Sequence, residues 1–416
     1  MPRFVPQCVM PAIAALTLSA CEEPAQWHGS LEAFLQGQPS QFSTVMSNPE
    51  QYRVQIIYTQ IDRDINNAPT FTSYKYRLNE SEYFYPASTI KLPTALVALQ
   101  AVSELAGEGV TRDTQMVIEG RQESAPLGVE PSDRRRSPTS VGDEVNRILL
   151  VSDNDAYNNL YEFVGYERLN QQLQQLSLPG TRIVHKLEVT PDEIENRRTH
   201  AVRFFEGGQT LYSQKENVSS SNYAAQAPVV LGKGEIVEDA LIQKPKDFSG
   251  KNAFPLQAQH DLIQALMFPD FVSVDRRLPL SEDDLHFVRK AMSTYPTNSD
   301  YTEYADQKLF PDGFVKFLMY GGDQTDIPDH IRIMNKSGQA YGFLADAAYI
   351  ADLKNGVEFI LAATIYTNAN GIFNDDLYEY DSIGFPFLRN LGTAIYELEL
   401  TRDREITPDL RAFDLR

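Results

Sequence analysis

Three short motifs in this 416-residue chain combine residue types that can carry out acyl transfer through a serine. A lone Ser-x-x-Lys motif carries little information, because a chain of this length contains about one such match by chance. Here two further polar motifs follow it in order, and the set of three is difficult to attribute to chance. The motifs are Ser88-Thr89-Ile90-Lys91, Ser152-Asp153-Asn154 and Lys336-Ser337-Gly338.

The spacing of Ser88 and Lys91 suits an activated nucleophile. Side chains three residues apart at a helix start share one face, so the lysine amine can reach the serine hydroxyl. A serine hydroxyl is a poor nucleophile until a base removes its proton, and a lysine can do this once desolvation or a nearby cation lowers its pKa. Lys336 would supply that cation. The plainer interpretation of Ser88 is a helix N-cap.

The other motif residues have possible roles in the same reaction. Ser152 lies between two helical segments, where its hydroxyl could relay a proton to a leaving nitrogen, whereas Asp153 is expected to be structural. The charge of Lys336 would attract a substrate carboxylate, and the backbone N–H groups of Ser88 and Gln339 could form an oxyanion hole. The substrate-binding candidates are Asn154, Lys336, Ser337, Gly338 and Gln339.

Hydrophobic periodicity predicts the elements that position these residues. Residues 22–50 read as a tether and a first amphipathic helix, and a basic run at 134–136 as part of a solvated loop. A helical pattern begins at Ser88. Further helices are predicted at 141–151, 155–164, 166–176, 256–267, 281–293 and 383–398, and strands at 54–61, 70–77, 331–335, 343–350 and 357–367.

Strands therefore occur at both ends of the chain and helices between them. We expect an α+β fold, in which both chain ends build one antiparallel sheet lobe with flanking helices, beside an all-α lobe. The site would lie at the seam between the lobes. The predicted boundaries are 51–400 for the domain, with the sheet lobe at 51–87 and 330–400, the helical lobe at 88–329, an insertion at 205–250 and a C-terminal tail at 401–416.

The three motifs in this order resemble those of class A β-lactamases and the related penicillin-binding proteins, over about residues 52–398. The resemblance implies a sheet lobe beside an all-α lobe and an acyl-enzyme on Ser88. Class A enzymes also place a general-base glutamate after the second motif, with an asparagine four residues later. Glu188 is the best positional candidate, but Asp192 stands four residues on, and the neighbouring competitors are Glu193 and Glu195.

The first twenty residues read as a targeting segment, with an apolar stretch too short to span a bilayer. The run Leu18-Ser19-Ala20-Cys21 resembles the lipobox of bacterial lipoproteins, in which the cysteine is lipidated. The alternative is a plain secretory signal that contains a cysteine. We expect a signal peptide at 1–20, lipidation at Cys21, and a protein exported to the periplasmic side of the bacterial envelope and anchored to a membrane.

Composition excludes several other classes of protein. The formal net charge of −20 argues against a nucleic-acid partner, which would need a basic face. The six histidines are scattered without zinc-ligand spacing, so neither a metal nor another cofactor is expected. We expect a monomer whose substrate is a small β-lactam or a peptidoglycan-like peptide.

Three hypotheses remain open from the sequence. The first is a serine hydrolase that opens a β-lactam or related amide through Ser88. The second is a penicillin-binding or D-Ala-D-Ala peptidase-like protein that acylates but deacylates slowly. The third is a non-catalytic module that binds the cell envelope, against which the intact set of Ser88, Lys91 and Lys336 counts.

Overall fold

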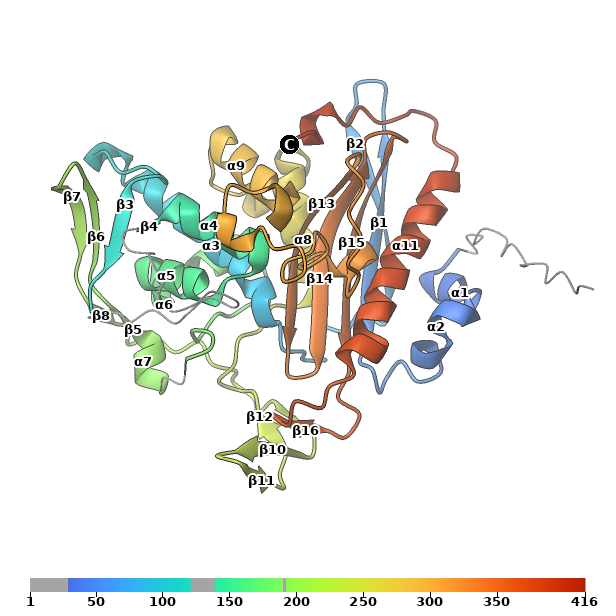
Figure 1. Ribbon diagram of the computed structural model, residues 1–416, viewed down its shortest axis with the longest axis horizontal. Coiled ribbons are helices and arrows are strands. Elements are labelled where there is room, and N and C mark those ends of the chain that lie inside the picture. The colour runs from blue at the N-terminus through green and yellow to red at the C-terminus, as the bar shows by residue number, and fades with distance from the viewer. Residues whose placement is uncertain (1–28, 121–138, 190–191, 416) are drawn as a thin grey trace, which may run out of the picture.

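The computed structural model describes residues 29–120, 139–189 and 192–415, which form two lobes side by side (Figure 1). The predicted signal segment at 1–20, Cys21 and the basic run at 134–136 lie outside the described residues. Within the described part of the chain, no helix combines the length and apolar character needed to cross a membrane.

The first lobe is built on a five-stranded sheet with the order β13-β14-β15-β1-β2, in which every neighbouring pair is antiparallel. Because β1 pairs with β15, the two ends of the chain share this sheet, as predicted. β13 forms the edge that faces the second lobe (Figure 1). The strands are β1 (Gln55–Arg63), β2 (Pro69–Tyr76), β13 (Ile331–Ala340), β14 (Phe343–Asp352) and β15 (Val357–Tyr366).

Both faces of this sheet are covered, so every residue of β14 is buried. Successive side chains of β14 alternate between two cores: Ala345 and Tyr349 belong to one, and Leu344 and Ile350 to the other. Helices α8 (Leu256–Met267) and α9 (Glu282–Ser293) cover the first side, and α1 (Leu31–Gln36), α2 (Pro39–Met46) and α11 (Phe385–Thr401) cover the second.

The second lobe surrounds the helix that follows the candidate nucleophile. That helix, α3 (Lys91–Glu104), is buried along most of its length and contacts its helical neighbours on several sides. The lobe also contains a four-stranded sheet with the order β4-β3-β6-β7, which the periodicity did not predict. Its other elements are α4 (Val141–Val151), α5 (Asn154–Val164), α6 (Tyr166–Gln175), α7 (Glu193–Arg197), β3 (Gln115–Ile118), β4 (Thr139–Ser140), β6 (Val202–Glu206) and β7 (Gln209–Gln214).

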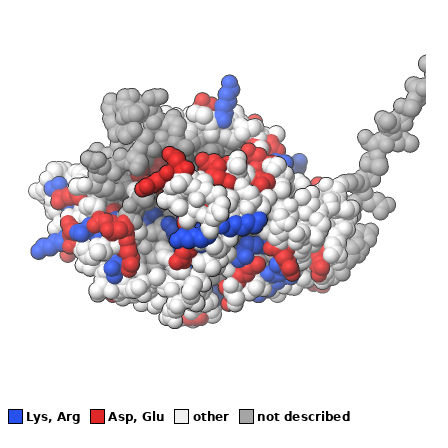
Figure 2. Space-filling model, turned by 90° about the horizontal axis from the view of Figure 1, so that it is seen from below, with Lys and Arg blue, Asp and Glu red and all other residues white. Residues whose placement is uncertain are grey.

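The predicted insertion at 205–250 divides into two parts. Its first part completes the sheet of the helical lobe through β6 and β7. Its later part projects at the bottom of Figure 1, where β10 (Gly234–Val237) lies between β11 (Ala240–Ile242) and β16 (Ile372–Phe373). Seen from below, the described residues carry a short row of Lys and Arg among acidic clusters (Figure 2).

The fold class predicted from the sequence is confirmed, with local differences that have physical causes. The single N-terminal helix is two short ones, because Gly37 ends the first and Pro39 starts the second. β13 runs to Ala340 and not only to residue 335, because its polar residues are buried against the other lobe. In the C-terminal tail, Phe413 is buried and lies 4.5 Å from the ring of Tyr349.

Candidate active site

Ser88 lies at the seam between the lobes, in a 3-10 turn (Ala87–Ile90) that leads into α3. The turn is held by Pro86, whose carbonyl oxygen accepts hydrogen bonds from the backbone N of Thr89 at 3.1 Å and from its hydroxyl at 2.8 Å. Ala87 has a φ of +48°, a strained conformation for a residue with a side chain. Such strain persists only where the surroundings hold it in place, so the half-exposed Ser88 is positioned by the fold.

Strand β13 packs directly against this turn at Gly338. A Cβ atom at Gly338 would lie 2.6 Å from the carbonyl oxygen of Pro86 and 2.9 Å from the backbone N of Ser88. Only glycine permits this approach, which brings the following residue of β13, the exposed Gln339, close to the nucleophile turn. The two backbone segments proposed for the oxyanion hole are therefore adjacent.

Replacing Gly338 with alanine is expected to slow acylation of Ser88 by about a hundredfold, because the added methyl group would push β13 away from the turn. The rate of labelling by a fluorescent penicillin measures this effect. Gly107→Ala is the matched control, since a Cβ there meets no atom within 4 Å. Equal labelling rates for both variants would show that the close approach at Gly338 is not needed.

Lys91 is completely buried, and its ammonium group reaches the second motif. Its Nζ donates to the hydroxyl oxygen of Ser152 at 3.2 Å, and also to the backbone carbonyl of Ser152 and the side-chain oxygen of Asn154. Burial lowers the pKa of Lys91 to about 7, although the charges of Asp153 and Glu188 act in the opposite direction. A substantial fraction of Lys91 is therefore neutral near pH 7 and able to accept a proton.

The second motif forms the corner between two helices. Ser152 ends α4 in the left-handed conformation, with a φ of +60°, and Asp153 caps α5 by accepting a hydrogen bond from the N–H of Ala156 at 2.9 Å. The structural role predicted for Asp153 is confirmed. This corner turns the hydroxyl of Ser152 toward both lysines, because its oxygen also accepts a hydrogen bond from the Nζ of Lys336 at 2.9 Å.

Lys336 on β13 is buried and donates a second hydrogen bond to the carbonyl of Ser337 at 2.8 Å. Its pKa lies well below the ordinary value, first because burial removes water and then because Lys91 and Lys316 add positive charge nearby; Asp346 opposes them. The sequence predicted that Lys336 would lower the pKa of Lys91 as a neighbouring cation; in the structure burial lowers the pKa of Lys91, and the charge of Lys91 lowers that of Lys336. The hydroxyl of Ser152 lies between their two amines.

Ser337 and a buried hydrogen-bond network lie next to Lys336 on β13. The buried hydroxyl of Ser337 donates to the carbonyl of Val315 at 2.8 Å, so it would have to exchange this bond to bind a substrate. Next to it, the Nζ of Lys316 donates to Asn335 at 2.9 Å, and Asn335 donates to Asp346 at 2.8 Å. The sequence analysis did not identify Lys316, Asn335 or Asp346, because no short motif connects them.

The loop that carries Glu188 is anchored to α5. Asn158 on that helix donates to the carbonyl of Leu187 at 2.8 Å and accepts from its N–H at 2.9 Å, and Lys186 forms a buried ion pair of 2.5 Å with Glu162. These contacts leave Leu187 buried and Glu188 exposed, with a φ of +52°. The charge of Glu188 acts to raise the pKa of Lys91, against the larger effect of burial.

The neighbouring acidic residues have contacts of their own. Asp192 caps α7 by accepting from the N–H of Glu195 at 2.8 Å, Glu195 pairs with Arg198 at 3.0 Å, and Glu193 lies 3.7 Å from Arg197. In the described part of the chain, no cluster of three or more His, Cys, Asp or Glu residues could hold a metal ion.

A model of the β-lactamase enzyme family matches residues 41–243 of this chain. No curated protein sequence matches this chain. Among solved structures, it is similar to a β-lactamase from Sphaerobacter thermophilus, with 15% identity over 86% of this chain and 97% of that one (TM-score 0.50). It is also similar to a class A β-lactamase from Bacteroides cellulosilyticus, with 13% identity over 86% and 97% (TM-score 0.50).

A third similar structure is a mutant of the penicillin-binding protein PBP-A, recorded as an acyl-enzyme complex with penicillin G. Identity is 17% over 90% of this chain and 98% of that one, with a TM-score of 0.50. Identities this low show a shared fold. Together with the family model, which covers just under half of the chain, they confirm the resemblance to β-lactamases and penicillin-binding proteins predicted from the three motifs.

Proposed function

We propose that this protein is a serine hydrolase that forms an acyl-enzyme on Ser88 with a β-lactam or a related amide. The observation that carries the proposal is the meeting of the Lys91 and Lys336 amines on the hydroxyl of Ser152, beside the turn that holds Ser88. A lysine whose pKa is about 7 can serve as a base at neutral pH.

In the proposed reaction, neutral Lys91 takes the hydroxyl proton of Ser88, and the serine oxygen attacks the substrate carbonyl. The N–H groups of Ser88 and Gln339 stabilise the resulting oxyanion. Ser152 then gives its proton to the leaving nitrogen and recovers one from Lys91, whose Nζ lies 3.2 Å away. Lys336 attracts the substrate carboxylate, and the side-chain nitrogen of Asn154 can donate to the substrate amide.

Two reagents test this proposal directly. A fluorescent penicillin reports acylation, and a chromogenic cephalosporin reports turnover. Rapid turnover supports a β-lactamase-like hydrolase, and a persistent fluorescent label supports a penicillin-binding protein that deacylates slowly. If neither reagent reacts, the proposal of an acyl-enzyme is wrong and an envelope-binding module is favoured.

We propose Glu188 as the group that activates the water for deacylation. The effect of its charge on the pKa of Lys91 supports this role. One observation favours the alternative of slow deacylation: the loop buries Leu187 and leaves Glu188 exposed. The contacts of Asn158 with the backbone of Leu187 fix that arrangement.

Glu188→Gln is expected to slow deacylation by about a hundredfold while acylation changes little, because the amide cannot accept a proton from water. The decay of the fluorescent label measures deacylation and its appearance measures acylation. Glu193→Gln at the start of α7 serves as the control. Decay at the wild-type rate in Glu188→Gln would remove Glu188 from the mechanism and favour the slowly deacylating alternative.

We also propose that the protein is exported and attached to a membrane through Cys21. Wild-type protein should partition with the membrane fraction, and Cys21→Ala should be released or keep its uncleaved leader. Cys8→Ala is the matched control, because Cys8 would leave with the predicted signal peptide. Wild-type protein found entirely in the soluble fraction with an unmodified N-terminus would refute lipid attachment.

A further inference from the structure

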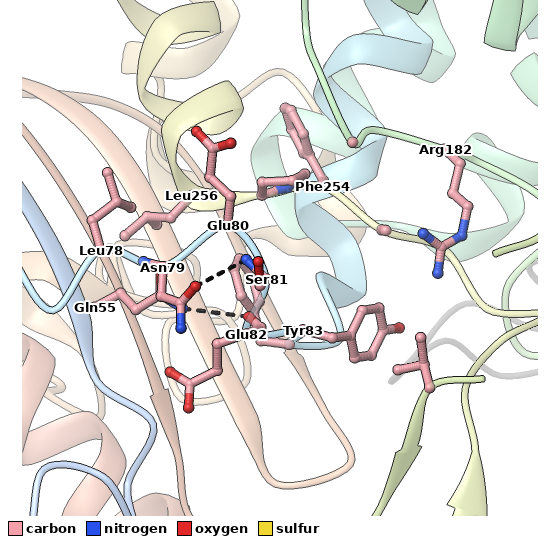
Figure 3. Close-up of a pocket in the computed structure, with 15 residues that line it drawn as sticks. Gln55, Leu78, Asn79, Glu80, Ser81, Glu82, Tyr83, Arg182, Phe254 and Leu256 are labelled. Atoms are coloured by element: carbon pink, nitrogen blue, oxygen red, sulfur yellow. Dashed lines mark hydrogen bonds between the residues drawn. The ribbon is translucent and has the colours of Figure 1, made fainter. Parts of the chain in front are cut away.

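A cavity of about 210 Å³ lies apart from the residues of the Ser88 site, between the segment that precedes the nucleophile and the start of α8 (Figure 3). Its walls come mainly from residues 78–84 and 253–256, together with Gly180 and Arg182. Much of the lining is apolar, including Leu78, Phe254 and Leu256. A small molecule with an apolar body could therefore be buried here.

Arg182 places a positive charge in the wall of this cavity, and within the described residues no carboxylate forms an ion pair with it. Its Nε and Nη2 atoms are buried, and no hydrogen-bond partner for them exists among the described residues. The guanidinium lies over the ring of Tyr83, with 5.8 Å between its central carbon and the ring centroid. Burial lowers the pKa of Arg182, and the nearby Tyr83 acts in the opposite direction. Buried donors without acceptors are costly, so they favour a bound acceptor.

The acidic residues of the lining do not neutralise Arg182. Glu82 lies 3.7 Å from Arg53 and forms an ion pair with it, while Glu80 is exposed to solvent. Figure 3 shows the guanidinium of Arg182 set apart from both carboxylates. A ligand with one negative charge would be balanced by Arg182, whereas a dianion would also be repelled by Glu80 and Glu82.

The start of α8 adds a second favourable feature for an anion. Pro255 and Leu256 line the cavity, and Pro255 is the N-cap of this 12-residue helix. No side chain caps the helix, and its first turn contains no acidic residue, so the positive end of the helix dipole is not compensated by the chain itself.

We propose that this cavity is a binding site for a small monocarboxylate with an apolar body. The carboxylate binds the Nε and Nη2 atoms of Arg182, which can hold two carboxylate oxygens in parallel. The apolar part packs against Phe254, which lies between Arg182 and the far end of the cavity (Figure 3). A free short-chain carboxylate and the C-terminal carboxylate of a short peptide share this chemistry.

Isothermal titration calorimetry with butyrate at constant ionic strength tests the proposal, and butyramide is the uncharged probe of the same shape. We expect saturable millimolar binding of butyrate and none of butyramide. Arg182→Met should weaken butyrate binding by roughly ten- to a hundredfold, which corresponds to the loss of charge-assisted hydrogen bonds. Arg112→Met is the control, because Arg112 also lies over a ring but is paired with Asp283 and Asp284.

N-Acetylalanine, which mimics a peptide C-terminus, distinguishes the two sources of the carboxylate: tighter binding than butyrate indicates a peptide, and weaker binding a free acid. Equal affinity of butyrate for wild-type and Arg182→Met would overturn the proposal. Binding of butyramide as tight as that of butyrate would do the same, as would no saturable binding of either carboxylate. The comparison of butyrate with butyramide uses wild-type protein, so it does not depend on how the variant folds.

Discussion

Replacing Ser88 with alanine is expected to abolish covalent labelling by a fluorescent penicillin. The variant lacks the only atom that the proposed mechanism acylates, and Lys91, Ser152 and Lys336 do not replace it because they serve to transfer protons or bind the substrate. Since the hydroxyl of Ser88 has no role in holding the turn, which depends on Thr89 and Pro86, the fold should be preserved. Gel fluorescence after denaturation measures the covalent label, and circular dichroism checks the fold.

Ser103→Ala is the matched control for this result. Ser103 lies on α3, the helix that follows the Ser88 turn, is exposed, and donates to the carbonyl of Gln100 at 2.7 Å. It should be labelled like wild type. Labelling of Ser88→Ala at the wild-type level would mean that another residue is the nucleophile, and the assignment of all three motifs would then be wrong.

Replacing Lys91 with methionine is expected to slow acylation by about a thousandfold or more, because the serine hydroxyl would lose its general base. Methionine retains an apolar stem in the buried position, which limits the structural damage. Stopped-flow measurement of penicillin acylation gives the rate. The exposed Lys75 on β2 provides the control variant, Lys75→Met, which should acylate like wild type.

The pH dependence gives a second measure of the same group. Burial lowers the pKa of Lys91 to about 7, and only the neutral amine can accept the proton of Ser88. The wild-type acylation rate should therefore rise as the pH increases through about 7 and then level off, and this rise should be absent from Lys91→Met. An unchanged pH profile in the variant would assign the titration to another group, and a wild-type rate would remove Lys91 from the mechanism.

The main elements of the fold could be predicted from the sequence because their hydrophobic patterns are strong. The helices expected at 141–151 and 256–267 are α4 and α8 with the same bounds. The small sheet of the helical lobe was missed because its strands are short and its pairing is non-local: β3 pairs with β6 from more than eighty residues further along the chain. Such pairing leaves no periodic signal in either segment.

The candidate site was predictable where chemistry is concentrated in short motifs and not where it depends on distant contacts. The sequence grouped Ser88, Lys91, Ser152 and Lys336, and the structure places the amines of Lys91 and Lys336 on the hydroxyl of Ser152. It did not indicate that Lys316 lies near Lys336, because no motif distinguishes a lone lysine in the apolar run at 314–319. The ion pair of Lys186 with Glu162 was likewise hidden, since a 24-residue separation has no periodicity.

The most direct test of the account is to locate the penicillin adduct by mass spectrometry. Trypsin should release residues 78–91 as one peptide, because Arg77 precedes it and Lys91 ends it. After reaction with penicillin, we predict that this peptide gains the mass of one penicillin molecule and that fragmentation places the addition on Ser88. An adduct on any other residue, with residues 78–91 recovered unmodified from labelled protein, would contradict the central claim that Ser88 is the nucleophile.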